Sequence, residues 1–205
     1  NSALYGFSGK IKTVKIALSM LGFNMGASIA MSSAINNILK PNLTPYEVNI
    51  ENFTHISSIQ SKIIGEWKDP KLKAIKNDLQ IAAFLQEVGK IIISMVLIEK
   101  KLVYQFQRKL EWWEDISSLE EKTVYKSSAE ITAMIFKHWK LNPKMISYIE
   151  FSDKPENAPD DLKNGAMALK IVKTLSPVFR ESLWERDLQK AMKLAESYGF
   201  EWSYI

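Results

Sequence analysis

The sequence predicts an all-α protein, and two observations lead to that prediction. Apolar residues recur at three- and four-residue steps along nearly the whole chain, which is the spacing that puts them on one face of a helix. No convincing run alternates apolar and polar residues as a strand does. With 205 residues, 46% of them hydrophobic and 24% charged, the chain can form one sizeable core or two small bundles that share an interface.

The first predicted helices end at residues that stop a helix. Residues 11–21 carry apolar side chains at helical steps, and Gly22 is placed to end that helix. A second helix is predicted over residues 51–67, and Asp69-Pro70 ends it. Its apolar stripe comprises Ile56, Ile59, Ile63, Ile64 and Trp67.

The stretch "LQIAAFLQEVGK", residues 79–90, predicts a buried helix. Asn77-Asp78 would cap its start, and Gly89 would close it in the left-handed conformation that other residues resist. A second apolar run, residues 91–98, follows at once. Because Gln86, Glu87 and Lys90 interrupt the most apolar window, no membrane span is predicted.

The second half of the chain also predicts helices. A helix over residues 128–140 would have Ile131, Met134, Ile135 and Trp139 on one face, and "LNP" would stop it before another begins near Lys144. The loop "SDKPENAPDD" resists helix until about Asp161.

The last predicted helix opens with Ser176-Pro177 as cap and first residue, and it ends at Gly199. A second start is available at Ser182, with Glu185 three residues on. The aromatic tail "YGFEWSYI" is expected to dock on the bundle.

The net charge and the cysteine content indicate which compartment and which partners to expect. The net charge of +4 and the pI near 9.0 fall short of a nucleic-acid signature, and the lysine run over residues 68–76 is expected to be a solvated turn and helix start. The chain has no cysteine, which excludes disulfides and thiolate chemistry and suits a reducing compartment. A cytoplasmic location is therefore expected.

The motifs of the common enzyme classes are missing from the sequence. It contains no G-x-S-x-G elbow, no phosphate-binding P-loop and no dinucleotide fingerprint. Its two histidines, His55 and His138, do not make a metal site without further ligands.

Five segments in order resemble HDOD domains, the HD-related output domains of bacterial signalling proteins. The resemblance covers about residues 1–176, and it implies an HD-like helical bundle preceded by part of a smaller N-terminal helical bundle. The segments are "NSALYGFSGKIKTVKIALSMLGFNMGASIAMSSAI", "FTHISSIQSKII", "LQIAAFLQEVGKIII", "AEITAMIFKHWKLNPKMISYIEFSDKPENAP" and "NGAMALKIVKTL".

HDOD domains are similar in fold to HD phosphohydrolases, whose metal site takes a histidine, an adjacent His-Asp pair and a later aspartate. The resemblance carries the first histidine to His55, the pair to Gln86 and Glu87, and the aspartate to Lys173. A glutamine is a weak neutral ligand, and a lysine brings a positive charge where a metal needs a carboxylate. The resemblance therefore implies a disabled metal site.

Further family positions have also lost histidine. Two that often carry a histidine pair are Ser152 and Asp153, and the position before Ala129-Glu130 is Ser128. The simultaneous changes at Glu87 and Lys173 motivate the hypothesis that these two side chains form an ion pair in place of the metal.

The resemblance implies three parts: residues 1–45 as the remainder of the N-terminal helical part, 46–176 as the degenerate HD-like bundle, and 177–205 as a C-terminal helix and tail packed on it. Because Asn1 falls inside a family element, helices of the intact protein are expected to precede it.

The function expected from these observations is a non-catalytic bacterial signalling or regulatory module that binds another macromolecule, most of all a protein. No catalytic residue, metal or cofactor is assigned. A candidate partner surface is Trp112-Trp113, of which one is expected in the core.

Two alternatives remain open. One is a residual metal-dependent phosphohydrolase on nucleotides or cyclic dinucleotides, which would use His55 and Glu87 with help from Asp153 or Glu130. The other is nucleotide or nucleic-acid binding without catalysis, motivated by the lysine run and the pI.

Overall fold

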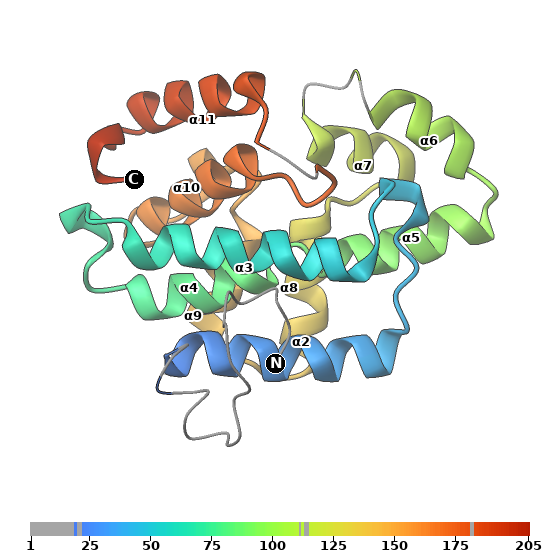
Figure 1. Ribbon diagram of the computed structural model, residues 1–205, viewed down its shortest axis with the longest axis horizontal. Coiled ribbons are helices and arrows are strands. Elements are labelled where there is room, and N and C mark those ends of the chain that lie inside the picture. The colour runs from blue at the N-terminus through green and yellow to red at the C-terminus, as the bar shows by residue number, and fades with distance from the viewer. Residues whose placement is uncertain (1–18, 20–21, 111, 113–114, 181–182) are drawn as a thin grey trace.

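The computed structural model describes residues 19, 22–110, 112, 115–180 and 183–205, and its regular elements over these residues are all helices, with no strand (Figure 1). The predicted all-α class is therefore confirmed. The α-helices are α2 (Phe23–Leu39), α3 (Ile50–Glu66), α4 (Lys76–Leu85), α5 (Gly89–Glu99), α6 (Val103–Leu110), α7 (Ile116–Val124), α8 (Ser128–His138), α9 (Pro143–Glu150), α10 (Asp160–Leu175) and α11 (Glu185–Ser197). Short 3₁₀ turns are η2 (Thr44–Tyr46), η3 (Pro70–Leu72), η4 (Pro155–Asn157) and η5 (Trp202–Tyr204).

Helix α3 confirms the stripe predicted over residues 51–67. The side chain of Asn49 caps its start by accepting a hydrogen bond from the Asn52 backbone N–H, 2.8 Å away. The helix ends at Trp67, which is fully buried. Except for Ser19, the predicted helix over residues 11–21 lies outside the described residues.

The junction between α4 and α5 differs from the prediction. Gly89 is the first residue of α5 and does not have a positive φ. A glycine is needed here because a Cβ atom would lie 2.1 Å from the backbone oxygen of Ser128. The close approach of α5 and α8, and not a left-handed cap, explains Gly89. Helix α4 begins at Lys76, with no side-chain cap.

Helix α8 buries a different face from the predicted one. Its buried residues include Ala129, Ala133 and Phe136, whereas Met134 is 54% exposed. Small side chains let α8 approach α5, so the larger apolar residues of the predicted face lie at the edge of the core.

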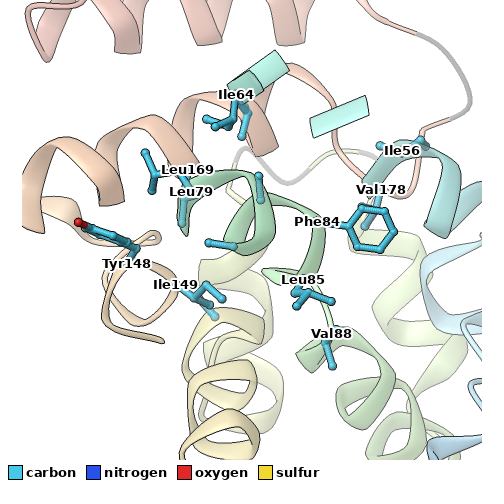
Figure 2. Packing of buried hydrophobic residues seen from close by; sticks show 14 of the residues in the cluster. Ile56, Ile64, Leu79, Phe84, Leu85, Val88, Tyr148, Ile149, Leu169 and Val178 are labelled. Atoms are coloured by element: carbon cyan, nitrogen blue, oxygen red, sulfur yellow. The ribbon is translucent and has the colours of Figure 1, made fainter. Parts of the chain in front are cut away.

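The core is formed where α3, α4, α9 and α10 pack against one another. Ile64, Leu79, Ile149 and Leu169 come from these four helices and are fully buried, and Figure 2 labels them among the residues of the hydrophobic cluster. Burying an aliphatic side chain of this size contributes about 1.5–3 kcal/mol relative to leaving it exposed. The N-terminal helix α2 packs on α4, where the Asn24 side chain donates to Gln80 Oε1 over 3.1 Å.

The C-terminal segment corrects another prediction. Ser176 follows the end of α10, and the next helix, α11, begins only at Glu185 and packs on α10 (Figure 1). The second predicted start, Ser182, lies outside the described residues. The residues after Ser176-Pro177 form a turn instead of a helix, in which the Arg180 backbone N–H donates to the Pro177 carbonyl over 3.0 Å and Val178 is fully buried.

The aromatic tail docks as predicted. Gly199 ends α11 with a φ of 70°, and Phe200 packs on Trp67 with 5.1 Å between ring centroids. The Lys68 backbone N–H donates to the carbonyl of Tyr204 over 2.9 Å. The tail is therefore part of the bundle surface.

One stretch of the described residues, Lys76–Glu99, is long and apolar enough to cross a membrane. In the structure 72% of its apolar window is buried inside the protein, as in a core helix of a folded bundle. The stretch spans α4 and α5 and the turn between them.

Candidate functional site

A buried lysine lies between two buried carboxylates at the start of α5. Lys90 Nζ is 3.0 Å from Glu87 Oε2 and 2.6 Å from Glu120 Oε1. All three residues are at most 4% exposed. Burial alone would lower the pKa of Lys90, but attraction by Glu120 and Glu87 outweighs it and raises that pKa well above its usual range. Lys90 therefore stays charged and is the shared counter-ion of both carboxylates.

Glu120, on α7, is held by three further elements. Its Oε1 accepts a hydrogen bond from the Tyr46 hydroxyl over 2.8 Å, and its Oε2 accepts one from the Ser128 backbone N–H over 2.6 Å. Lys90 Nζ also donates to Ser128 Oγ over 3.1 Å. Burial and the charge of Glu120 raise the pKa of Tyr46 well above 10.0, so the tyrosine remains a donor. The network ties η2, α5, α7 and α8 together.

A second buried pair joins Lys173 of α10 to Asp153, which follows α9. Lys173 Nζ donates to Asp153 Oδ1 and, over 3.2 Å, to Ser152 Oγ. Lys170 donates to the backbone oxygen of Asp153. Burial would raise the pKa of Asp153, but Lys173 lowers it more strongly, so this carboxyl is ionised.

These pairs correct the hypothesis that Glu87 and Lys173 form an ion pair. Glu87 has Lys90 as its partner, three residues on, and Lys173 has Asp153. The physical reason is the turn at residues 86–88, because α5 starts immediately after it and brings Lys90 next to Glu87.

The side chain of Gln86 takes part in a hydrogen-bond network that joins several helices. Its Nε2 donates to Gln60 Oε1 over 2.9 Å, and Gln60 Nε2 donates to the backbone oxygen of Ser176 over 2.7 Å. The Gln86 carbonyl accepts from the Thr132 hydroxyl over 3.1 Å, and Thr132 Oγ1 accepts from the Gly89 backbone N–H over 2.8 Å. Gln86 thus links α3 to the α4–α5 turn and to α8.

A cavity of about 380 Å³ opens beside the two lysine pairs. Glu87, Asp153 and Lys173 all line it, so the structure brings these three predicted positions together. Ser152 is not among the described lining residues, but it accepts a hydrogen bond from Lys173, which lines the cavity. His55 is not among the described residues that line this cavity. It is half-buried on α3, and its Nδ1 has no hydrogen-bond partner among the described residues.

The residues present do not fit the metal that an HD-like fold implies. Glu87 and Asp153, the two cavity carboxylates at the positions carried over from the metal site, already have lysine ammonium groups in contact with them. A divalent cation would have to displace these ammonium groups and would meet their repulsion. In the described part of the chain no group of three or more His, Asp or Glu side chains could hold a metal ion.

Sequence reasoning missed Lys90, Glu120 and Tyr46 as parts of the site. The spacing of Glu87 and Lys90 by three residues gave a local signal, since such pairs face each other on a helix. Nothing local could indicate Glu120 or Tyr46, because their contacts with each other span 74 positions of the chain.

The sequence indicated two candidate partner surfaces, Trp112-Trp113 and the lysine run over residues 68–76. Trp112 is 77% exposed, whereas Trp113 lies outside the described residues. In the lysine run, Lys71 donates to the Gly199 carbonyl and Lys76 donates to that of Gly65. The run contains four lysines, and two of them therefore have structural roles.

All regular elements of the described residues are helices, and their arrangement is consistent with an HD-like helical bundle. The family model described as HDOD domain matches residues 1–155, and the chain belongs to this family, which is related to HD phosphohydrolases. No curated protein matches the chain in a sequence comparison.

Two solved structures are similar in fold. A virulence factor from Campylobacter jejuni subsp. jejuni matches with a TM-score of 0.62 and 23% identity, over 98% of this chain and 74% of the other. The protein from Shewanella amazonensis SB2B named "Putative phosphohydrolase" matches with a TM-score of 0.63 and 16% identity, over 97% and 71%. At these identities the likeness concerns the fold alone.

Proposed function

We propose that this protein is a non-catalytic signalling or regulatory module of the bacterial cytoplasm that acts by binding another macromolecule. The observation that carries the proposal is the pairing of two cavity carboxylates, Glu87 and Asp153, with the ammonium groups of Lys90 and Lys173. These two carboxylates are therefore counter-ions of buried lysines and are not free to bind a metal or accept a proton.

The chemistry of these pairs argues against turnover. A general base must lose its proton easily and then regain it, whereas Asp153 has a lowered pKa and makes a direct contact with Lys173. Lys90 has a raised pKa, so it is a poor source of a proton near neutral pH. The pairs suit a rigid core better than a reaction.

A protein partner suits the exposed aromatic side chains near α6. Trp112 is 77% exposed and Tyr104 is 70% exposed, and large aromatic residues are frequent anchors in protein interfaces. The proposal predicts that Trp112→Ala weakens capture of a specific partner from the source organism, while Lys137→Ala on α8 leaves it unchanged. Equal recovery of all proteins by both variants would argue against a Trp112 surface.

A separate experiment tests whether the protein lacks phosphohydrolase activity. Phosphate release from mono- and diesters would be measured with Mn²⁺ or Mg²⁺ for the wild type and for Glu87→Gln. The proposal predicts no release above background in either protein. Metal-dependent release that disappears in Glu87→Gln would establish the phosphohydrolase alternative instead.

Nucleic-acid binding is the remaining alternative, and salt dependence tests it. Binding through phosphates weakens steeply between about 50 and 200 mM salt. We expect no such binding, since Lys71 and Lys76 of the basic run donate hydrogen bonds to backbone carbonyls. Steeply salt-dependent binding of a duplex or a single strand would overturn this expectation.

A further inference from the structure

Helix α11 forms part of the wall of the cavity beside Glu87 and Asp153. Lys170, Lys173 and Thr174 line the same cavity from α10. The residues that α11 contributes are Arg186, Asp187, Lys190, Lys193 and Leu194. Because a space of about 380 Å³ lies next to these side chains, part of the inner face of α11 is not packed against the bundle.

Helix α11 also buries little apolar surface. Among the described elements it packs most extensively on α10 (Figure 1). Its buried side chains are Asp187, Ala191 and Ala195, which follow one another at four-residue steps and therefore lie on one face. Leu188 and Leu194 are only partly buried. An element with so few buried apolar contacts is expected to open at a lower free energy than the core helices do.

A buried ion pair holds the start of α11. Arg180 Nε lies 2.7 Å from Asp187 Oδ2, and the two side chains are only 9% and 8% exposed. The guanidinium carbon of Arg180 also lies 3.9 Å from the centre of the Trp184 ring. A buried pair fixes a geometry more than it adds stability, because both charges lose their hydration. The Arg180–Asp187 pair therefore determines where the start of α11 docks.

Other contacts hold the end of α11. Phe200 packs on Trp67, and Lys71 donates to the carbonyl of Gly199. The small buried side chains of Ala191 and Ala195 lie between these two attachments. The helix is thus held firmly at its ends, whereas its middle has little apolar contact and lies beside the cavity.

We propose that α11 is a displaceable wall of the cavity. It separates from α10 as one helix while the rest of the bundle stays folded, and the Arg180–Asp187 pair controls this opening. Separation uncovers the α10 side of the cavity, where Lys170 and Lys173 lie. Opening of this kind goes beyond the proposed function and does not depend on it, since it concerns only how α11 is held.

A single introduced thiol reports the opening at one place, because the chain has no cysteine. Ala191→Cys places a thiol on the buried face of α11, and Ser94→Cys places one in α5, where Ser94 is fully buried. Labelling of the full chain with a maleimide would be followed by mass spectrometry. We expect Ala191→Cys to react at least about 100-fold faster than Ser94→Cys, because α11 opens without global unfolding. Equal rates would show that α11 leaves only when the whole protein unfolds, and they would overturn the proposal.

A second position on α11 distinguishes opening from fraying. Ala195 is fully buried and lies one turn beyond Ala191. If α11 leaves as one helix, Ala195→Cys and Ala191→Cys should react at rates within about threefold of each other. A larger difference would mean that the helix frays from one end, which contradicts opening as a unit.

Arg180→Met tests control by the ion pair. In this variant the nearest remaining cation in the described ion pairs of Asp187 is Arg186, at 3.9 Å from its other oxygen. Opening then brings a poorly compensated carboxylate into water, so labelling of Ala191→Cys should become at least about tenfold faster. As a control, Lys137→Met removes an exposed pair on α8 and should leave this rate within about twofold. An unchanged rate in Arg180→Met would overturn control by the pair.

Hydrogen exchange of the unmodified chain gives the same comparison without a substitution. Amides of residues 185–197 should exchange at least about 100-fold faster than the most protected amides of α4, and at least about tenfold slower than those of an unfolded peptide. Protection equal to that of α4 would mean that α11 opens only with the whole protein. No protection would mean that α11 is not docked, and either result would overturn the proposal.

Discussion

The ammonium group of Lys90 lies 2.6 Å from the carboxylate of Glu120, a residue 30 positions away on another helix. Both side chains are almost fully buried, and Glu87 completes the group at 3.0 Å from the same ammonium. This buried charge group includes Glu87, one of the positions that the family resemblance assigns to a metal ligand. It makes the site an internal ion network, and its energetics can be tested directly.

Removing Lys90 should destabilise the protein strongly. Lys90→Met leaves Glu87 and Glu120 as buried carboxylates without a counter-ion, and we expect a loss of about 3–5 kcal/mol in the free energy of unfolding. Urea denaturation measures this loss. As a control, Lys137→Met removes an exposed pair with Glu150 and should cost less than about 1 kcal/mol.

The same network predicts coupling between Lys90 and Glu120. In Lys90→Met, a second change Glu120→Gln removes one of the two unpaired buried charges, so the double variant should be more stable than the sum of the single losses implies. Strict additivity in a double-mutant cycle would contradict a direct contact.

Stability should depend on pH in opposite directions at the two ends of the scale. Asp153 has a pKa below its usual 3.8, so its contribution is present above about pH 3.8 and is lost as the pH falls through the lower folded value. Lys90 has a pKa above its usual 10.5, so its contribution is present below pH 10.5 and is lost only as the pH rises through the higher folded value.

Urea denaturation at a series of pH values would measure both the loss of stability at acid pH (the acid limb) and the loss at alkaline pH (the alkaline limb). For the wild type we expect a plateau between about pH 5 and 9, because neither group changes charge there. Asp153→Asn should flatten the acid limb, and Lys90→Met should flatten part of the alkaline limb. Tyr46 also contributes to the alkaline limb, because its pKa is raised. An acid limb that is unchanged in Asp153→Asn would show that other carboxylates dominate.

Gly89→Ala should disturb the approach of α5 to α8. The added Cβ would meet the backbone oxygen of Ser128 at 2.1 Å, and a backbone atom cannot move aside as a side chain can. We expect a loss of about 3 kcal/mol by thermal or chemical unfolding. Gly65→Ala is the control, because its Cβ would meet the side-chain amide of Gln80, which can shift at the expense of its hydrogen bond with Asn24, and the change should cost less than about 1.5 kcal/mol. Similar values for both variants would refute the close-approach explanation.

Phe200→Ala should release the C-terminal tail. Phe200 is 4% exposed and packs on Trp67, so we expect a loss of about 3–5 kcal/mol or, if only the tail detaches, faster proteolysis after α11. Tyr204→Ala should have little effect, since the contact of Tyr204 with Lys68 uses its backbone oxygen. An unchanged proteolysis rate and stability for Phe200→Ala would contradict docking of the tail.

The sequence predicted the helices well where periodicity and capping residues agree. The stripe of α3 is one example, and the start of α9, predicted near Lys144 and found at Pro143, is another, because the signals lie in or next to the helix itself. Gly89 was misinterpreted because its role depends on the Ser128 carbonyl of a different helix, which no local pattern reveals. The face of α8 was misjudged because close packing favoured small side chains over the larger apolar ones.

The candidate site was predictable only in part. Glu87, Asp153 and Lys173 were identified through the family resemblance, and they do line one cavity. Their pairing was not predictable, because the choice between Lys90 and Lys173 as the partner of Glu87 depends on the sharp turn before α5.

The central claim is that lysine ammonium groups occupy the place of a metal. Native mass spectrometry of the full chain, purified without chelator and then exposed to Mn²⁺, tests it most directly. The account predicts the mass of the bare polypeptide, alone or in an oligomer, for the wild type and for Glu87→Gln alike. A stoichiometric metal adduct that is present in the wild type and lost in Glu87→Gln would contradict it.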